Sequence, residues 1–127
     1  MADITPRFGA TGVGVSDLRR STDFYTEVFG MTVVTKFKLP DMEEIILSFG
    51  RGAALVLMCH VDGSGHDLAN TGGKLVFYVA DPVATAQLAR ERGAEVVREP
   101  TPIPEFNDAV VGFVKDPDGH LLELLQA

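Results

Sequence analysis

The sequence predicts an α+β domain of two βαβββ modules, related by a pseudo-twofold axis, whose strands form a cup-shaped mixed sheet. Two observations carry this prediction. An apolar run that ends in an aspartate occurs twice, at Asp17 and at Asp81, about 64 residues apart. Each aspartate opens a stretch of helical periodicity that ends at a glycine, Gly30 in the first copy and Gly93 in the second. We therefore expect one domain over residues 1–127, with module one at 8–60, a connector at 61–73 and module two at 74–127.

Local patterns place the elements of the first module. The helix is expected to begin at Ser16 or Asp17, since either side chain can cap it, and to end at Gly30. Apolar residues recur at helical spacing between these limits. Strands are expected on both sides of this helix, at residues 9–15, 32–38, 44–49 and 53–60.

The second module repeats this order. Asp81 caps its helix, and Pro82 occupies the first helical position, where a missing N–H has no cost. The turn Asp116-Pro-Asp-Gly119 is typical of a hairpin. Strands are expected at residues 74–79, 95–98, 109–115 and 120–125, with a proline-spaced loop at 100–108.

Composition excludes several classes of partner. The net charge of −7 argues against a nucleic-acid groove or an anionic membrane surface, because both need clustered basic residues. No apolar run is long enough to span a membrane, and no secretion signal precedes the first strand. The single cysteine, Cys59, lies in an apolar strand and is expected to be a small buried hydrophobe. These features favour a cytoplasmic protein.

Strand alternation predicts which side chains face the inside of the cup. Glu123 lies in the apolar run Leu121–Leu125, and burying an unpaired carboxylate there would cost several kcal/mol. Glu123 is therefore expected to line a wet cavity or to meet a cation. The expected lining of the cup comprises Gly12, Gly14, Val56, Met58, His60, Lys74, Val76, Tyr78, Leu121 and Glu123, with Phe106 of the 100–108 loop near its mouth.

Several motifs together resemble those of a known superfamily. They are Val15-Ser-Asp-Leu18, Asp23-Phe-Tyr25, Phe29-Gly-Met31 and, above all, the run from Phe113 to Glu123. The chain resembles the vicinal oxygen chelate superfamily, the group of glyoxalases, bleomycin-resistance proteins and extradiol dioxygenases. The resemblance covers essentially the whole chain. It implies two βαβββ modules that form a cup and a homodimer as the expected assembly.

The same resemblance implies a divalent metal, with one ligand from the first and one from the last strand of each module. Carried over by position, these ligands fall on Ala10, Val56, Lys74 and Glu123, and only Glu123 has a suitable donor. We therefore expect no metal and no other cofactor. The histidines do not rebuild the site, and His120 is expected at the surface.

Two arrangements of Lys74 remain open at this point. The lysine ammonium can stand in for the missing metal and pair with Glu123, which would make the carboxylate a weak base. Alternatively, Lys74 can extend to solvent and leave Glu123 among apolar walls.

Three functions compete. The first is a metal-independent isomerase, or related lyase, that moves a proton next to a carbonyl of an apolar ligand, with ketosteroid-type isomerisation as the first candidate. In this hypothesis Glu123 or Asp108 is the base, and Tyr78, Lys74 or His60 donates to the enolate oxygen. The second is a non-catalytic drug-binding protein of the bleomycin-resistance kind. The third is a metal-dependent glyoxalase or dioxygenase.

Overall fold

The computed structural model describes residues 5–62, 69 and 72–127. The first module forms a four-stranded sheet in the order β1-β4-β3-β2, in which β1 and β4 run parallel and the other neighbours are antiparallel. Its elements are β1 (Ala10–Gly14), α1 (Leu18–Phe29), β2 (Thr32–Lys38), β3 (Met42–Ser48) and β4 (Ala54–His60).

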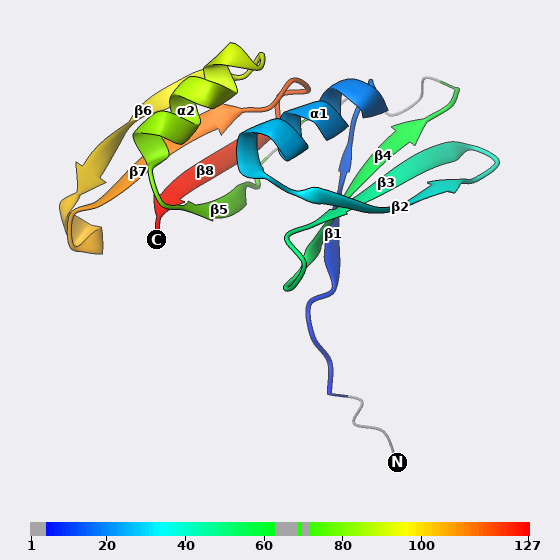
Figure 1. Ribbon diagram of the computed structural model, residues 1–127, viewed down its shortest axis with the longest axis horizontal. Helices are drawn as coiled ribbons and strands as arrows, with labels where there is room; N and C mark the ends of the chain where they lie inside the picture. Colours follow the sequence, from blue (N-terminus) through cyan, green and yellow to red (C-terminus); the bar gives the residue numbers. More distant parts are fainter. Residues whose placement is uncertain (1–4, 63–68, 70–71) are drawn as a thin grey trace.

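The second module has the same topology, with the sheet order β5-β8-β7-β6 and a parallel β5–β8 pair. The two predicted βαβββ modules are thereby confirmed. The two sheets lie side by side, and both helices cover the same side (Figure 1). The elements of this module are β5 (Leu75–Val79), α2 (Pro82–Glu91), β6 (Glu95–Ile103), the short 3-10 helix η1 (Pro104–Phe106), β7 (Ala109–Lys115) and β8 (Leu121–Gln126).

The helix ends follow the sequence signals. The Asp17 carboxylate accepts a hydrogen bond from the backbone N–H of Arg20 at 3.0 Å, and Asp81 accepts one from Ala84 at 3.1 Å. Gly30 closes α1 with a φ of 78°, a left-handed conformation that glycine adopts without a steric penalty.

The apolar core lies between each sheet and its helix, and aromatic rings join the two modules. Phe24 and Tyr25 of α1 are fully buried. Phe29 of α1 stacks on Phe77 of β5, with ring centroids 4.0 Å apart and planes inclined by 14°. Since α1 belongs to the first module and β5 to the second, this stack holds the modules together.

The turn between β7 and β8 makes a second junction between the modules. Asp118 accepts hydrogen bonds from the N–H and hydroxyl of Ser16, the guanidinium of Arg20 and the hydroxyl of Ser21. Asp116, which is buried, accepts one from the Tyr25 hydroxyl at 2.6 Å. Two carboxylates of module two are thus held by donors from module one.

His120 lies inside this junction, so its expected surface position is wrong. Its side chain is buried, and its Nε2 hydrogen-bonds to the carbonyl of Gly14 at 2.7 Å. Sequence spacing alone placed His120 in an exposed turn. Docking of that turn against β1 buries it.

The segment expected as a loop at 100–108 also differs, because β6 continues to Ile103. β6 is an edge strand, and its pairing with β7 shifts register between Arg98 and Thr101. Pro100 lies at that irregularity, where a missing N–H breaks no regular ladder. Only residues 104–108 leave the strand, through η1 and two positive-φ residues, Asn107 and Asp108.

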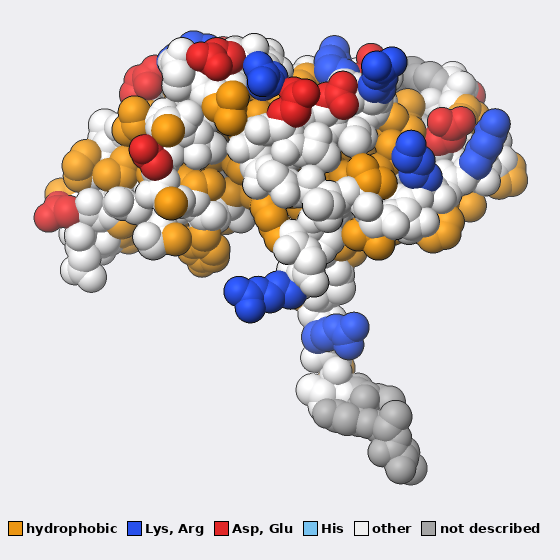
Figure 2. All heavy atoms as spheres, in the orientation of Figure 1, with side chains coloured by type: hydrophobic (Ala, Val, Ile, Leu, Met, Phe, Trp, Pro, Cys, Tyr) orange, Lys and Arg blue, Asp and Glu red, His pale blue; other side chains and the backbone are white. Residues whose placement is uncertain are grey.

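The surface separates by residue type. Figure 2 shows most of the acidic and basic side chains along the helix side of the molecule, with others over β2, β3 and the N-terminal segment, and many hydrophobic side chains over the sheets. In the part of the chain that the structure describes, no helix is long and apolar enough to cross a membrane. The cytoplasmic location stays a prediction.

Candidate functional site

Glu123 lies at the bottom of a cavity of about 300 Å³ on the inner face of module two. The cavity is formed by β6, β7 and β8 together with η1 and the residue that precedes β5. The polar side chains that line it are Lys74, Arg98, Glu105 and Glu123. Its apolar walls are Ile103, Phe106, Val111 and Phe113.

Lys74 and Glu123 form an ion pair in this cavity. The Glu123 side chain is 7% exposed and that of Lys74 is 48% exposed, so the pair joins a buried carboxylate to a half-exposed ammonium. The Lys74 ammonium also lies 5.7 Å from the centroid of the Phe113 ring, within cation–π distance. Of the two arrangements left open by the sequence, the structure has the paired one.

Arg98 and Glu105 add two further charges to the cavity. Arg98 forms no ion pair with any described residue, whereas Lys74 is held by Glu123. Sequence reasoning missed Arg98, because its cross-strand pairing depends on two register shifts in β6 that the sequence does not reveal. Arg98 pairs across the strands with Phe113, which pairs with Glu123, so the three side chains share one face of the sheet.

The 3-10 helix covers part of this cavity. Ile103 and Phe106 line it, and Phe106 is 54% exposed. Asp108, the reserve base of the sequence hypothesis, is exposed and is not part of the lining.

The site residues expected from module one lie on the other sheet. Gly12 pairs with Val56, and Gly14 with Met58, along the parallel β1–β4 ladder. A Cβ on Gly12 would lie 3.1 Å from the Met58 sulfur, so the thioether covers the backbone of β1. Neither these four residues nor His60 line the cavity of Glu123.

Three further expected residues do not line the cavity of Glu123, although Val76 is the cross-strand neighbour of Glu123 in the β5–β8 ladder. Val76 and Tyr78 line a different cavity, of about 670 Å³, between β5 and the β1 side of module one. Tyr78 is 74% exposed there, with no described acidic group beside it in that cavity. Leu121 lines a third hollow with Lys115, near the end of the connector.

Cys59 is half-buried on β4, and burial raises the pKa of its thiol. A raised pKa keeps the thiol protonated at neutral pH, which disfavours a nucleophilic role.

The residues present do not fit the divalent metal that the superfamily resemblance implies. Of the four ligand positions, Ala10 and Val56 carry hydrocarbon side chains, and Lys74 is an ammonium bound to the one carboxylate, Glu123. Among the described residues, no three His, Cys, Asp or Glu side chains are grouped so that they could hold a metal ion.

Comparison with known proteins assigns the fold to a superfamily. Residues 7–124 match the Glyoxalase/Bleomycin resistance protein/Dioxygenase superfamily. This chain belongs to that superfamily. Two curated relatives illustrate the likeness. The probable lactoylglutathione lyase of Synechocystis is 35% identical over 121 residues, which are 91% of this chain and 92% of that protein. Lactoylglutathione lyase GLX1 of Arabidopsis thaliana is 34% identical, with 88% of this chain and 41% of that protein covered.

Solved structures of the superfamily have the same fold as this chain. The trypanothione-dependent glyoxalase I of Leishmania major has a TM-score of 0.80 and 28% identity, with 96% of this chain and 87% of that chain covered. Glyoxalase I from Zea mays has a TM-score of 0.79 and 26% identity, and the match covers 95% of this chain and 44% of the maize chain. This chain therefore spans less than half of the maize and Arabidopsis proteins.

These relatives overturn the first functional hypothesis. The prediction of a metal-independent, ketosteroid-type isomerase with an apolar ligand is wrong, since relatives at 30–35% identity are named lactoylglutathione lyases. The structure supplies a physical reason. That hypothesis needs a carboxylate isolated among apolar walls, and Glu123 is instead bound to an ammonium.

Proposed function

We propose that this chain is a small-molecule-binding member of the superfamily, which holds an anionic ligand of the glutathione-conjugate class in the cavity of module two. In this proposal it performs no metal-dependent lyase reaction. The observation that carries the proposal is the Lys74–Glu123 ion pair, which lies where the superfamily resemblance implies metal ligands.

The lining supports this ligand class. Glutathione conjugates carry carboxylates and an apolar S-substituent. Arg98 has no described ion-pair partner, and a guanidinium can bind a carboxylate with two parallel hydrogen bonds. Ile103, Phe106 and Val111 provide apolar contact for the S-substituent. The relatives are named lactoylglutathione lyases, which points to the same class of compound.

The ion pair determines what the cavity can do chemically. Glu123 is buried and its charge is balanced by Lys74, so proton transfer from a ligand would have to break the pair first. The Lys74 ammonium also lies over the Phe113 ring, within cation–π distance, which helps to keep it beside Glu123. This arrangement binds and orients charge, and it offers no free base beside the ligand.

A second candidate function is a metal-dependent lactoylglutathione lyase, the third hypothesis from the sequence. It is favoured by one observation, the 35% identity to a probable lactoylglutathione lyase over nine tenths of both chains. It requires metal donors that Ala10, Val56 and Lys74 do not supply.

Two measurements distinguish these functions. Calorimetry with S-lactoylglutathione and S-hexylglutathione is expected to show saturable binding that Arg98→Met weakens about tenfold, the effect of losing a charge-assisted hydrogen bond. Arg7→Met, the same change on an exposed residue outside the cavity, should leave binding unchanged. Formation of S-lactoylglutathione from methylglyoxal and glutathione is expected to stay at the uncatalysed rate, with or without added Ni²⁺ or Zn²⁺.

Turnover that depends on the added metal would establish the lyase and refute the proposal. Absence of binding by both conjugates would refute the ligand class.

We also propose that two copies of this chain associate through the inner faces of their sheets. Val76, Tyr78 and Phe106 are apolar or aromatic residues exposed by 43%, 74% and 54% on that side. A second copy would bury them, as is usual for exposed apolar patches at homodimer interfaces.

A further inference from the structure

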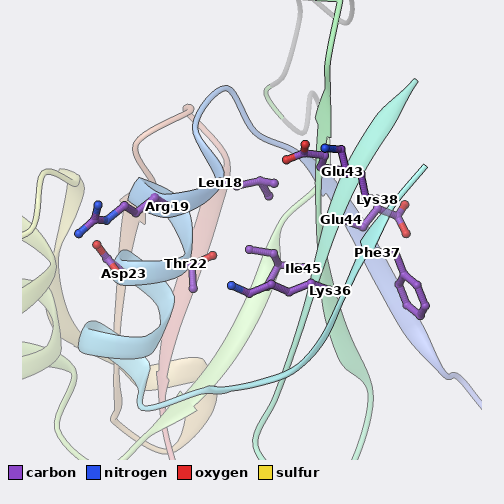
Figure 3. A pocket seen from close by; sticks show the side chains of 10 residues that line it. All are labelled: Leu18, Arg19, Thr22, Asp23, Lys36, Phe37, Lys38, Glu43, Glu44 and Ile45. Atoms are coloured by element: carbon purple, nitrogen blue, oxygen red, sulfur yellow. The ribbon is translucent and has the colours of Figure 1, made fainter. Parts of the chain in front are cut away.

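A further cavity lies on the helix side of module one, on the face of the sheet opposite to Val56 and Met58 (Figure 3). It measures about 580 Å³ and lies between the first half of α1 and the hairpin of β2 and β3. The hairpin includes the edge strand of its sheet, so the cavity is open on the outer side of that strand. Neither the ion pair nor any residue of the proposed binding site belongs to its lining.

The register of the hairpin determines which side chains enter this cavity. Ile45 is buried under α1, and Lys36 is its cross-strand partner, so both side chains lie on the helix side. Lys38 and Glu43 form the next pair on this face. The intervening pair, Phe37 and Glu44, lies on the opposite face, and Figure 3 shows these two side chains pointing away from α1.

Six charged side chains line the cavity, and five of them lie on its helix side. These five are Arg19 and Asp23 of α1 and Lys36, Lys38 and Glu43 of the hairpin. None of them forms an ion pair within the described chain, although four ion pairs form elsewhere among the described residues. With Glu44, which lies on the opposite face of the hairpin, the lining holds three cations and three carboxylates, so the cavity as a whole has no net charge. The ammonium of Lys36 forms no ion pair with a described carboxylate, and it is the group here that favours an anionic ligand.

Thr22 supplies a second polar feature. Its hydroxyl oxygen is buried and has no hydrogen-bond partner among the described residues. A threonine in a helix commonly bonds the carbonyl one turn earlier, and a buried hydroxyl without any partner destabilises the fold. Figure 3 shows the amino end of Lys36 directed at α1 beside Thr22, with Leu18 and Ile45 close by. An ammonium, an unpaired hydroxyl and an apolar floor therefore meet in one cavity.

We propose that this cavity binds a small organic acid, separately from the cup. The carboxylate accepts hydrogen bonds from the Lys36 ammonium and the Thr22 hydroxyl, and the hydrocarbon body packs on Leu18 and Ile45. Arg19 and Lys38 add long-range attraction for the anion. Asp23 and Glu43 repel ligands that carry more than one negative charge. The proposal does not depend on the function assigned to the Glu123 cavity.

The test uses hexanoate, with amide chemical shifts of the labelled full-length chain as the readout. Saturable shifts are expected in residues 18–23 of α1 and 36–45 of the hairpin. Lys36→Met and Thr22→Val should each weaken hexanoate binding about tenfold, the usual effect of losing one hydrogen bond to a charged group. Lys36 is exposed, and valine has nearly the shape of threonine, so both variants should stay folded. Lys115→Met, on β7 of the other module, is the charge-matched control.

Three probes and one variant separate the possible outcomes. Hexanol and hexylamine test the need for the negative charge, inorganic phosphate tests the need for the hydrocarbon body, and Lys74→Met tests whether the shifts arise in the cup. The proposal requires that hexanoate binds more tightly than all three probes and that Lys74→Met leaves its affinity unchanged. Equal binding of phosphate or hexylamine, shifts confined to the inner face, or the absence of saturation would overturn it.

Discussion

At the scale of single residues, the ion pair between Lys74 and Glu123 can be tested by its effect on the free energy of unfolding. Replacing Lys74 by methionine leaves the Glu123 carboxylate buried without a counter-charge, which should lower the free energy of unfolding by about 1–3 kcal/mol. The double variant Lys74→Met/Glu123→Gln removes both charges and should recover much of that loss. Urea unfolding of the two single variants and the double variant gives the coupling energy. Additive effects would mean that the pair contributes nothing, and the proposed role of the pair would be lost.

Tyr25 gives a pH-dependent prediction. Burial and the adjacent Asp116 carboxylate raise the pKa of Tyr25 well above its usual value. Above about pH 10 the tyrosine of the unfolded chain loses its proton while the folded protein keeps it. The unfolded state then binds fewer protons, so Tyr25 should lower stability by up to about 1.4 kcal/mol per pH unit until the folded-state pKa is reached.

Urea unfolding at several pH values from about 9 to 11 tests this effect of Tyr25. Tyr25→Phe should show a shallower loss of stability than the parent protein, whereas Tyr78→Phe, at an exposed position, should keep the parent slope. Identical slopes for all three proteins would show that Tyr25 is not the group responsible.

At the scale of secondary-structure elements, the absence of a side chain at Gly112 of β7 allows Pro100 of β6 to pack closely against the β7 backbone. A Cβ at this position would lie 2.7 Å from Pro100 Cγ and 3.1 Å from Pro100 Cα. Because a backbone atom is among these neighbours, Gly112→Ala should displace the strand and cost about 1–3 kcal/mol.

Gly12 is the matched control for that change. Its closest neighbours are the sulfur and terminal methyl of Met58, at 3.1 and 3.2 Å, and a flexible side chain can move aside. Thermal unfolding should therefore show a larger loss for Gly112→Ala than for Gly12→Ala. The reverse order would mean that the Pro100 contact is not rigid.

The irregular β6 also explains why its length was not predicted. Pro100, Pro102 and Pro104 suggest a loop, because proline cannot donate to a regular ladder. An edge strand with two register shifts tolerates such residues, and neither its edge position nor its shifts can be read from the local sequence.

At the scale of the whole molecule, the Asp116–His120 turn holds the modules together. Asp118→Ala removes the acceptor for donors of Ser16, Arg20 and Ser21. Amide hydrogen exchange should then accelerate both in the turn and at the start of α1, which belongs to the other module. Asp41→Ala, at an exposed position in the β2–β3 turn, is the control. Faster exchange in the turn alone would show that the junction does not couple the modules.

The proposed dimer is also tested at the scale of the whole molecule. Light scattering at micromolar concentration should give the mass of two chains, and Tyr78→Glu should shift the protein towards the monomer by placing a charge on the exposed inner face. Val83→Glu introduces the same charge at an exposed position on α2, and it should leave the mass unchanged. A monomeric parent protein would refute the assembly.

The sequence by itself determined the repeated fold, because its signals are local. Asp17 and Asp81 cap their helices through backbone groups three residues away, and Gly30 ends α1 through its own φ. Alternation along β8 placed Glu123 on the inner face for the same reason. The lack of metal donors at Ala10, Val56 and Lys74 is a property of the side chains themselves.

The tertiary structure decided which groups the side chains of the inner face contact. Pairing of Lys74 with Glu123 depends on how two strands dock, and the sequence left two outcomes open. Burial of His120 depends on contact between modules, so no pattern near residue 120 reveals it. Separation of Met58 and Val56 from Glu123 follows from two sheets lying side by side. Each of these is a contact between segments distant in the chain, and such contacts depend on packing geometry that residue order does not specify.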